Sequence, residues 1–330
     1  MSDLRVLLAL ATSTGGVGAH VRSLADRVPT AGVACPAATQ EVFGFPSWLQ
    51  WEVGNRLRPS RDAKALRVLR HHASDYDVVH AHGLRAGALA VLAVRTPVVV
   101  TLHNQVGGRL GAALERLVAR RASVVLAASA DLAERARALG GRDVRFVPVA
   151  APALAPPVGD PGLGNPLVLA VGRLHPQKGY DVLLRALPLL GEAVVAVAGD
   201  GPLEAQLRAA APEVRWLGRR TDRADLYAAA DVVVLPSQWE ARSLVAQEAM
   251  RAGRPLVATD VGGMAELVGD GAVLVPAGDA PALAHAVRRL LDDPSAAAAL
   301  AGRARAVAAT WPDEDAVAAT LRAVYAEVAR

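Results

Sequence analysis

The most informative part of this 330-residue chain reads Pro236-Ser-Gln-Trp-Glu-Ala-Arg-Ser-Leu-Val-Ala-Gln-Glu-Ala-Met-Arg-Ala-Gly253. The β-branched run Asp231-Val-Val-Val-Leu235 before it predicts a buried strand. Residues 243–252 favour a helix, and Gly253 stands where a C-terminal glycine cap belongs. A second strand is predicted at Pro255-Leu-Val-Ala-Thr259. This order of strand, loop, helix and strand is typical of an α/β domain with a parallel sheet.

Two carboxylates lie eight residues apart in this part of the chain. Glu240 falls in the predicted loop, and Glu248 falls in about the second helical turn. Both can face the space beyond the strand ends, where open α/β sheets bind ligands. The helix N-terminus between them, near Ser243 and Leu244, favours an anionic group. A nucleotide-sugar, with hydroxyls at both ends and a diphosphate in the middle, fits this arrangement, although two glutamates at this spacing are by themselves common beside helices.

The surrounding residues resemble the E-x7-E signature of retaining glycosyltransferases of family 4, which have the GT-B fold. The matching positions are Pro236, Ser237, Glu240, Glu248, Ala249, Met250, Gly253, Pro255, Ala258, Thr259, Gly262, Gly263 and Glu266. Two positions depart from the family pattern: Ser243 replaces the usual glycine and Arg242 replaces the usual aromatic residue. Because both belong to the donor sugar pocket of the family, the resemblance leaves the sugar open.

The resemblance implies an α/β chain with the GT-B fold, in which two Rossmann-like, doubly wound parallel-sheet domains face a cleft. We expect an acceptor-side domain over residues 1–150 and a nucleotide-sugar-binding domain over 167–310. The proline- and glycine-rich segment 151–166 is predicted to be the linker. A last helix over 311–330, marked by Trp311, is expected to cross back to the first domain.

Composition narrows the class of protein. A single cysteine, Cys35, excludes an internal disulfide and a cysteine zinc site. No apolar run of about 18 residues predicts a transmembrane helix, and the N-terminal residues lack a cleavable signal pattern, so we expect a cytoplasmic protein. The net charge of +4 is compatible with an anionic partner, but the 4% aromatic content gives no support for nucleic-acid binding.

A glycine loop follows the first predicted strand, residues 5–10. Such a loop before a helix lets backbone N–H groups approach a phosphate. The dinucleotide fingerprint fits badly, because Val21 stands at the position of its third glycine. Gly15 and Gly16 instead resemble the G-G loop of the first GT-B domain, which faces the donor phosphates and the acceptor; a plain tight turn is the alternative.

The predicted strand Asp77-Val-Val-His-Ala-His82 ends in two histidines that share one face. Metal binding is one interpretation, but no third ligand at metal spacing is evident, and we expect no metal. In the family the second histidine, here His82, lies near the donor sugar. A further histidine, His103, matches a position at the rim of the family's cleft, whereas His80 is expected to be structural.

Two cations flank the predicted strand-to-helix turn at Gly172-Arg-Leu-His-Pro-Gln-Lys-Gly179. Arg173 and Lys178 match the family pattern G-R-x-x-x-x-K-G, whose cations hold the donor diphosphate and stabilise it as it departs. Because these cations take the place of a metal, we expect no cofactor and no divalent ion.

The most basic segment is 56–73. A helix from about Arg61 would expose Lys64 and Arg67, with Arg70 beside them. We interpret this face as a surface that docks on anionic lipid headgroups at the inner side of a membrane. A solvated helix face is the alternative interpretation.

Together these features predict a retaining hexosyltransferase that uses a UDP- or GDP-sugar and an acceptor hydroxyl, for which a membrane lipid or a cell-envelope glycan precursor is a candidate. The predicted catalytic residues are Glu240, His82, Arg173 and Lys178. The predicted donor-binding residues are Gly15, Gly16, Arg173, Lys178, Arg242, Ser243, Leu244 and Glu248. A sugar phosphorylase or nucleotide-sugar epimerase of the same fold, and a non-catalytic nucleotide-sugar-binding module, remain alternatives.

Overall fold

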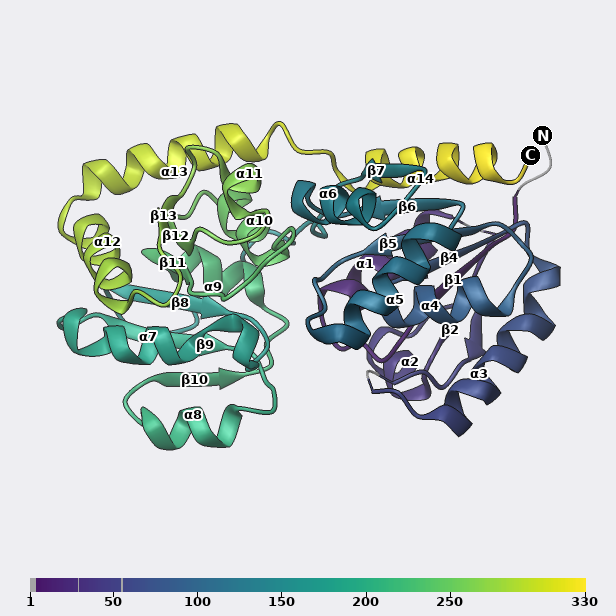
Figure 1. Cartoon of the computed structure of the whole chain (residues 1–330). Coiled ribbons are helices and arrows are strands. Elements are labelled where there is room, and N and C mark those ends of the chain that lie inside the picture. The colour runs from purple at the N-terminus through teal and green to yellow at the C-terminus, as the bar shows by residue number, and fades with distance from the viewer. Residues whose placement is uncertain (1–3, 29, 55) are drawn as a thin grey trace. The chain divides into compact units, whose positions relative to one another are not determined.

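The computed structural model describes residues 4–28, 30–54 and 56–330. The chain divides into two compact units. Unit 1 comprises Met1–Pro152 together with Pro312–Arg330, and unit 2 comprises Ala153–Trp311. Figure 1 shows the two units, with the last helix, in yellow, covering unit 1. Within the described ranges, no helix is both long enough and apolar enough to cross a membrane.

Unit 1 is built on a parallel sheet whose strand order is β3-β2-β1-β4-β5-β6-β7. The strands are β1 (Val6–Leu10), β2 (Ala31–Cys35), β3 (Trp48–Gln50), β4 (Val78–His82), β5 (Val98–Leu102), β6 (Val124–Ala127) and β7 (Val144–Phe146). Every residue of β1, β2, β4, β5 and β6 is buried. Such uninterrupted burial is expected of parallel strands that are covered on both faces.

Helices cover both faces of this sheet. They are α1 (Gly16–Arg27), α2 (Ala37–Phe43), α3 (Pro59–His72), α4 (Leu84–Ala93), α5 (Gly108–Arg121), α6 (Ala130–Ala138) and α14 (Glu314–Val328), with the short 3-10 helix η1 (Ala73–Asp75) after α3. The helices α3, α4 and α5 pack in that order, whereas α14 packs against α1. The apolar side of α14 contributes Leu321 and Tyr325 to the core of unit 1, and its Asp315 pairs with Arg27 at 2.7 Å.

Unit 2 repeats the architecture with a parallel sheet in the order β10-β9-β8-β11-β12-β13. Its strands are β8 (Leu167–Val171), β9 (Val194–Ala198), β10 (Arg215–Gly218), β11 (Val232–Leu235), β12 (Leu256–Thr259) and β13 (Val273–Val275). Its helices are η2 (Pro176–Lys178), α7 (Tyr180–Ala186), η3 (Leu187–Leu189), α8 (Glu204–Ala210), α9 (Arg223–Ala229), α10 (Leu244–Arg251), α11 (Met264–Val268), α12 (Ala280–Asp292) and α13 (Pro294–Ala308). Apolar side chains form a separate core on each face of the sheet.

The strand order reverses once in each unit, between β1 and β4 in unit 1 and between β8 and β11 in unit 2. Loops that leave the carboxyl ends of strands at such a reversal diverge to opposite faces and leave room for a ligand. The prediction of two Rossmann-like, doubly wound parallel-sheet domains is confirmed.

Three details differ from the sequence-based expectations. The first helix begins at Gly16, inside the glycine loop that was expected to precede it, because part of that loop forms the first helical turn. The basic helix begins at Pro59, which suits the first turn of a helix because proline lacks the N–H that would be unpaired there. Trp311 lies before the final helix, which starts at Glu314 behind the capping residue Asp313.

Candidate functional site

Two loops leave the sheet of unit 2 at its point of strand reversal, and they pack tightly on each other. The first follows β8 and contains Arg173 and Lys178; the second follows β11 and contains Glu240. The amide of Gln238 donates to the carbonyl of Gln177 at 2.7 Å. Gly179 has a φ of +64°, and a Cβ there would lie 1.9 Å from the carbonyl oxygen of Pro236. The turn that carries Lys178 therefore requires glycine for both its conformation and its approach to the second loop.

Lys178 and Glu240 meet where these loops touch. The Nζ of Lys178 lies 2.5 Å from Oε1 of Glu240, and the hydroxyl of Ser237 donates to the same oxygen at 2.7 Å. The Glu240 side chain is only 8% exposed, whereas that of Lys178 is 22% exposed. Charge-assisted bonds of this kind fix an otherwise flexible carboxylate in place.

The main chain around Glu240 is held from the other side by the Gly262-Gly263 turn. The amide of Gly263 donates to the Glu240 carbonyl at 2.9 Å. Gly262 has a φ of +53°, and a Cβ there would lie 2.1 Å from that same carbonyl oxygen. The paired glycines in the signature thus allow the turn between β12 and α11 to pack against the loop that carries Glu240.

The helix α10 starts immediately after this loop. Ser243 is its N-cap, and the Ser243 hydroxyl accepts from the amide of Ala246 at 3.3 Å. Leu244 is the first helical residue. Because the first N–H groups of a helix have no partner within it, this terminus offers backbone donors and a partial positive charge beside Glu240 and Lys178.

Glu248 lies one turn further along α10 and is almost completely buried, with a side chain 1% exposed. Arg223 donates to its Oε1, and the hydroxyl of Tyr227 donates to its Oε2 at 2.9 Å. Burial raises the pKa of Glu248, while the charge of Arg223 and the hydrogen bond from Tyr227 oppose that rise. Neither donor was predicted from the sequence, although their i, i+4 spacing places both on one face of α9.

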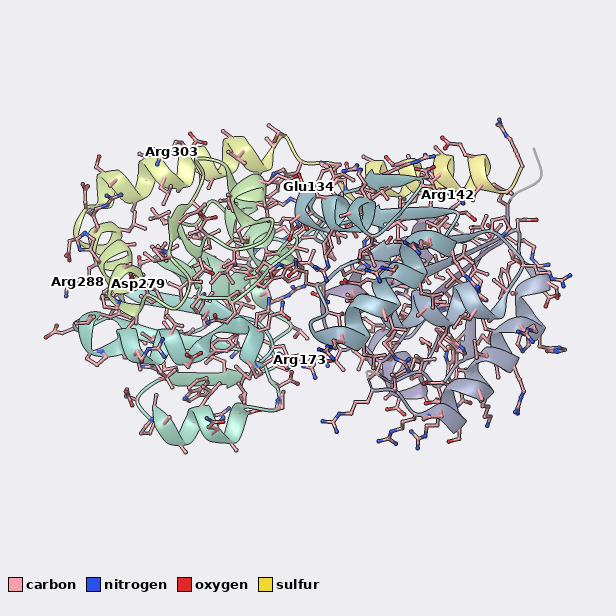
Figure 2. All side chains as sticks on the ribbon, viewed as in Figure 1. Glu134, Arg142, Arg173, Asp279, Arg288 and Arg303 are labelled. Carbon is pink, nitrogen blue, oxygen red and sulfur yellow. The ribbon has the colours of Figure 1, made fainter. Side chains whose placement is uncertain are left out.

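Among the described residues, neither of the two predicted arginines of this unit is a hydrogen-bond partner of Glu240 or Glu248. Arg173 is exposed, and Figure 2 labels it at the edge of unit 2. The guanidinium carbon of Arg242 lies 5.9 Å from the centre of the Trp311 ring. Burial lowers the pKa of Arg242, and its Nε has no hydrogen-bond partner among the described residues.

In unit 1, the predicted glycine loop follows β1, at the strand reversal. Gly15 is the N-cap of α1 and Gly16 its first residue, and both are exposed. Gly18 in the same turn packs against Phe43, so that a Cβ there would lie 2.1 Å from a ring carbon. The loop thus presents exposed backbone amides on a tightly packed helix start, which is suitable for an anion.

A cluster of buried histidines fills the other side of this strand reversal. The Nδ1 of His82 lies 3.2 Å from Nε2 of His103, and the His20 ring stands edge-on to both. His80 bonds through its two nitrogens to Tyr325 and Thr101, each at 2.7 Å, which agrees with a structural role. The Nε2 of His82 is buried and has no partner within the described part of the chain.

Burial keeps these histidines neutral. It lowers the pKa of His20 to about 4 and, together with the neighbouring His20, that of His80 to about 3. The pKa values of His82 and His103 are also lowered well below the usual value, with burial as the largest cause. Neutral rings can donate or accept hydrogen bonds to a hydroxyl, but they do not supply positive charge. Among the described residues, no three potential ligand side chains group together as a metal site.

The basic helix of unit 1 presents the predicted cations. Lys64, Arg67 and Arg70 are exposed on α3. The Nε of Arg70 donates to the carbonyl of Ala93 at 3.0 Å, so part of this side chain is used within the unit. Upstream, Trp51 is fully buried, whereas Trp48 is 40% exposed.

Comparison with known proteins identifies the family. Residues 6–152 match a family model described as a glycosyl transferase 4-like domain, and residues 165–293 match one described as glycosyl transferases group 1. A D-inositol 3-phosphate glycosyltransferase of Xylanimonas cellulosilytica is 32% identical over 318 residues, covering 81% of this chain and 76% of the relative. A phosphatidyl-myo-inositol mannosyltransferase of Mycobacterium leprae is 37% identical over 243 residues, covering 66% and 64%.

Solved structures agree in fold. The crystal structure of HepE from Anabaena, in complex with UDP and glucose, superimposes with a TM-score of 0.84 at 23% identity and covers 98% of this chain and all of that one. A sucrose-phosphate synthase from Thermosynechococcus elongatus gives a TM-score of 0.81 at 22% identity, covering 98% and 99%.

The Gly262 contact predicts a specific loss of stability. Gly262→Ala forces a Cβ against the Glu240 carbonyl and strains a left-handed residue, so we expect it to lower the free energy of unfolding by about 3 kcal/mol. Gly278→Ala is the control, because Gly278 also has a positive φ, +80°, but faces open space; it should cost only about 1 kcal/mol. Urea denaturation measures both, and equal losses would contradict the proposed support of Glu240.

The histidine cluster predicts that acid destabilises unit 1. A histidine whose pKa is lowered by folding binds its proton more readily in the unfolded chain. The free energy of unfolding is therefore highest above about pH 6.5 and decreases as the pH falls towards the folded pKa. Each such residue costs about 1.4 kcal/mol per pH unit in that window. Urea denaturation measures the free energy of unfolding at each pH. Between pH 6.5 and 5, His20→Phe should reduce the slope of this free energy against pH by the amount that corresponds to nearly one bound proton. An unchanged slope would contradict the assignment.

Proposed function

Because this chain belongs to the family 4-type glycosyltransferases of the GT-B fold, we propose that it is a retaining enzyme that moves a hexose-type sugar from a UDP- or GDP-sugar to an acceptor hydroxyl. Transfer from nucleotide-sugar donors is common to the family. The retaining outcome, the donor and the acceptor are the proposal.

The observation that carries the proposal is the grouping of Lys178, Glu240 and the start of α10 at the strand reversal of unit 2. A cation, a fixed carboxylate and a helix N-terminus lie side by side there. A nucleotide-sugar has its anionic diphosphate directly beside its neutral, hydroxyl-rich sugar, so adjacent positive and negative recognition groups suit that junction. The structural neighbour from Anabaena, which binds UDP and glucose, supports the same choice of ligand.

Each residue then has a definite role. Lys178, Arg173 and the amides of Ser243 and Leu244 hold the diphosphate, and Glu240 accepts hydrogen bonds from sugar hydroxyls near C3 and C4. Glu248 accepts from the ribose hydroxyls. Contacts of Arg242 with the donor, of Gly15 and Gly16 with its phosphates, and of His82 with the sugar near C6 stay predictions from the resemblance.

The reaction step in this proposal is a front-face substitution at the anomeric carbon. The bond from that carbon to the diphosphate oxygen breaks, and the acceptor oxygen bonds to the same face. The acceptor proton passes to the departing phosphate oxygen. Because Arg173, Lys178 and the helix terminus offset the negative charge that develops on the diphosphate, the proposal needs neither a divalent ion nor a covalent enzyme intermediate.

For the acceptor, we propose an alcohol carried by a membrane lipid or a cell-envelope glycan precursor. Named relatives support this choice: the Mycobacterium leprae mannosyltransferase acts on phosphatidyl-myo-inositol, and a Bacillus subtilis relative, 33% identical, is named for teichuronic acid biosynthesis. The exposed Lys64 and Arg67 on α3 would bring the enzyme to such an acceptor at an anionic bilayer.

The diphosphate assignment predicts the effect of removing its cations. Arg173→Ala and Lys178→Ala should each lower the turnover rate roughly 10²–10³-fold, the scale for losing one group that stabilises developing charge. Turnover is followed as release of the nucleoside diphosphate, and proton NMR of the product reports the anomeric configuration. Arg208→Ala is the control, since Arg208 pairs with Glu204 on α8. Near-normal turnover in both variants, an inverted product, or release of a sugar phosphate would contradict the proposal.

The membrane assignment predicts a charge-dependent interaction with vesicles. Changing both Lys64 and Arg67 to Gln should weaken binding to phosphatidylglycerol vesicles about 25-fold, at about 1 kcal/mol for each cation. The matched control changes Arg288 and Arg303, on the outer helices of unit 2 (Figure 2), to Gln. It lowers the net charge by the same amount as the test variant. Co-sedimentation measures both, and equal weakening would show attraction by net charge alone.

A further inference from the structure

We propose that Arg223 is a positioning residue of the donor site: from the first turn of α9 it holds the Glu248 carboxylate ionised and turned towards the ribose hydroxyls. This inference rests on the proposed function for the ligand, but the contacts that carry it lie wholly within unit 2. Arg223 is no part of the signature that identified the family.

The geometry is that of a clamp with one donor for each carboxylate oxygen. Arg223 and Tyr227 are four residues apart, so they lie on the same face of α9. Arg223 donates to Oε1 of Glu248 and Tyr227 donates to Oε2. With both oxygens held, the plane of the carboxylate cannot rotate, although each oxygen keeps a second lone pair for a ligand hydroxyl.

The two donors are not equivalent. Tyr227 is fully buried, and burial beside Glu248 raises its pKa well above the usual value, so it stays a neutral donor. Only Arg223 brings a full positive charge to the carboxylate from α9. Its side chain is 37% exposed while its partner is 1% exposed, so the ion pair spans the boundary between solvent and core.

That charge is needed because Glu248 is buried. Burial is the largest influence on the pKa of Glu248 and raises it. Opposing it are Arg223 and Tyr227 from α9 and Arg251 from α10 itself. Of the other elements packed on α10, β12 carries no titratable side chain, and Arg305 of α13 lies against Gly253 beyond the end of the helix. Loss of Arg223 therefore raises the pKa of Glu248 further.

A protonated Glu248 would be a poorer ribose ligand, since it has lost acceptor capacity. If only the ionised form binds, nucleotide affinity falls roughly tenfold for each pH unit below the pKa of Glu248. An ordinary structural ion pair would not produce this behaviour, because its loss would weaken binding equally at every pH.

The test compares wild type with Arg223→Gln, which removes the charge, and Arg223→Lys, which keeps it. Arg208→Gln on α8 is the control for losing one arginine of unit 2. The dissociation constants of UDP and GDP are measured by calorimetry from pH 8.5 to 5.5. We expect Arg223→Gln to approach the wild-type affinity at pH 8.5 and to bind at least tenfold more weakly at pH 6, while Arg223→Lys and Arg208→Gln follow the wild-type profile.

Thermal unfolding gives a second readout that needs no ligand. An acid whose folded pKa is raised destabilises the fold when it is ionised, so the difference in Tm between wild type and Arg223→Gln should widen as the pH rises and narrow towards pH 5.5. A binding profile in Arg223→Gln that parallels wild type, or a Tm difference that is constant with pH, overturns the positioning role alone. If wild type binds neither UDP nor GDP, the proposed donor fails and the ribose role falls with it.

Discussion

The proposed donor site depends on a single contact, the ion pair between Lys178 and Glu240 at the strand reversal of unit 2. It joins two loops that leave neighbouring strands, and each loop reaches this position only because glycine permits it: Gly179 approaches the Pro236 carbonyl and Gly262 approaches the Glu240 carbonyl. A site assembled in this way is fixed before the ligand arrives. The loops then lose less conformational entropy when the ligand binds, which is the advantage of a preorganised site.

Burial acts in opposite directions on the titratable groups of the two units. In unit 1 it lowers the pKa values of four histidines, which stay neutral. Among the described residues, none of these histidines is hydrogen-bonded to a charged side chain. In unit 2 it raises the pKa of Glu248, and Arg223 opposes the rise. The outcome is a neutral cluster of buried hydrogen-bonding groups in one unit and a charged cluster in the other. Sugar and acceptor hydroxyls suit the first, and ribose hydroxyls beside a diphosphate suit the second.

The sequence predicted the fold well because its strands are short, buried and separated by glycine-marked turns, and because the signature from Pro236 to Glu266 is dense. It also placed Lys178 and Glu240 in loops that each follow a predicted strand. It did not show that they pair with each other, nor that Arg223 and Tyr227 hold Glu248, because such contacts join residues 21 to 62 positions apart. Hydrophobic periodicity describes one element at a time. The strand β3 was therefore not predicted, because its three residues include the partly exposed Trp48. Trp311 was assigned to the final helix, which begins three residues later.

The most direct test of a preformed donor site in unit 2 is a thermal-shift screen of wild type and Glu248→Ala with UDP-, GDP-, dTDP- and ADP-sugars, without added metal. A ligand that binds the folded state adds RT ln(1 + [L]/Kd) to its stability, about 2.7 kcal/mol at a concentration 100 times Kd. The account predicts that one class of nucleotide, UDP- or GDP-linked, raises the Tm of wild type and that Glu248→Ala abolishes the rise. No rise with any donor, or an equal rise in Glu248→Ala, would contradict it.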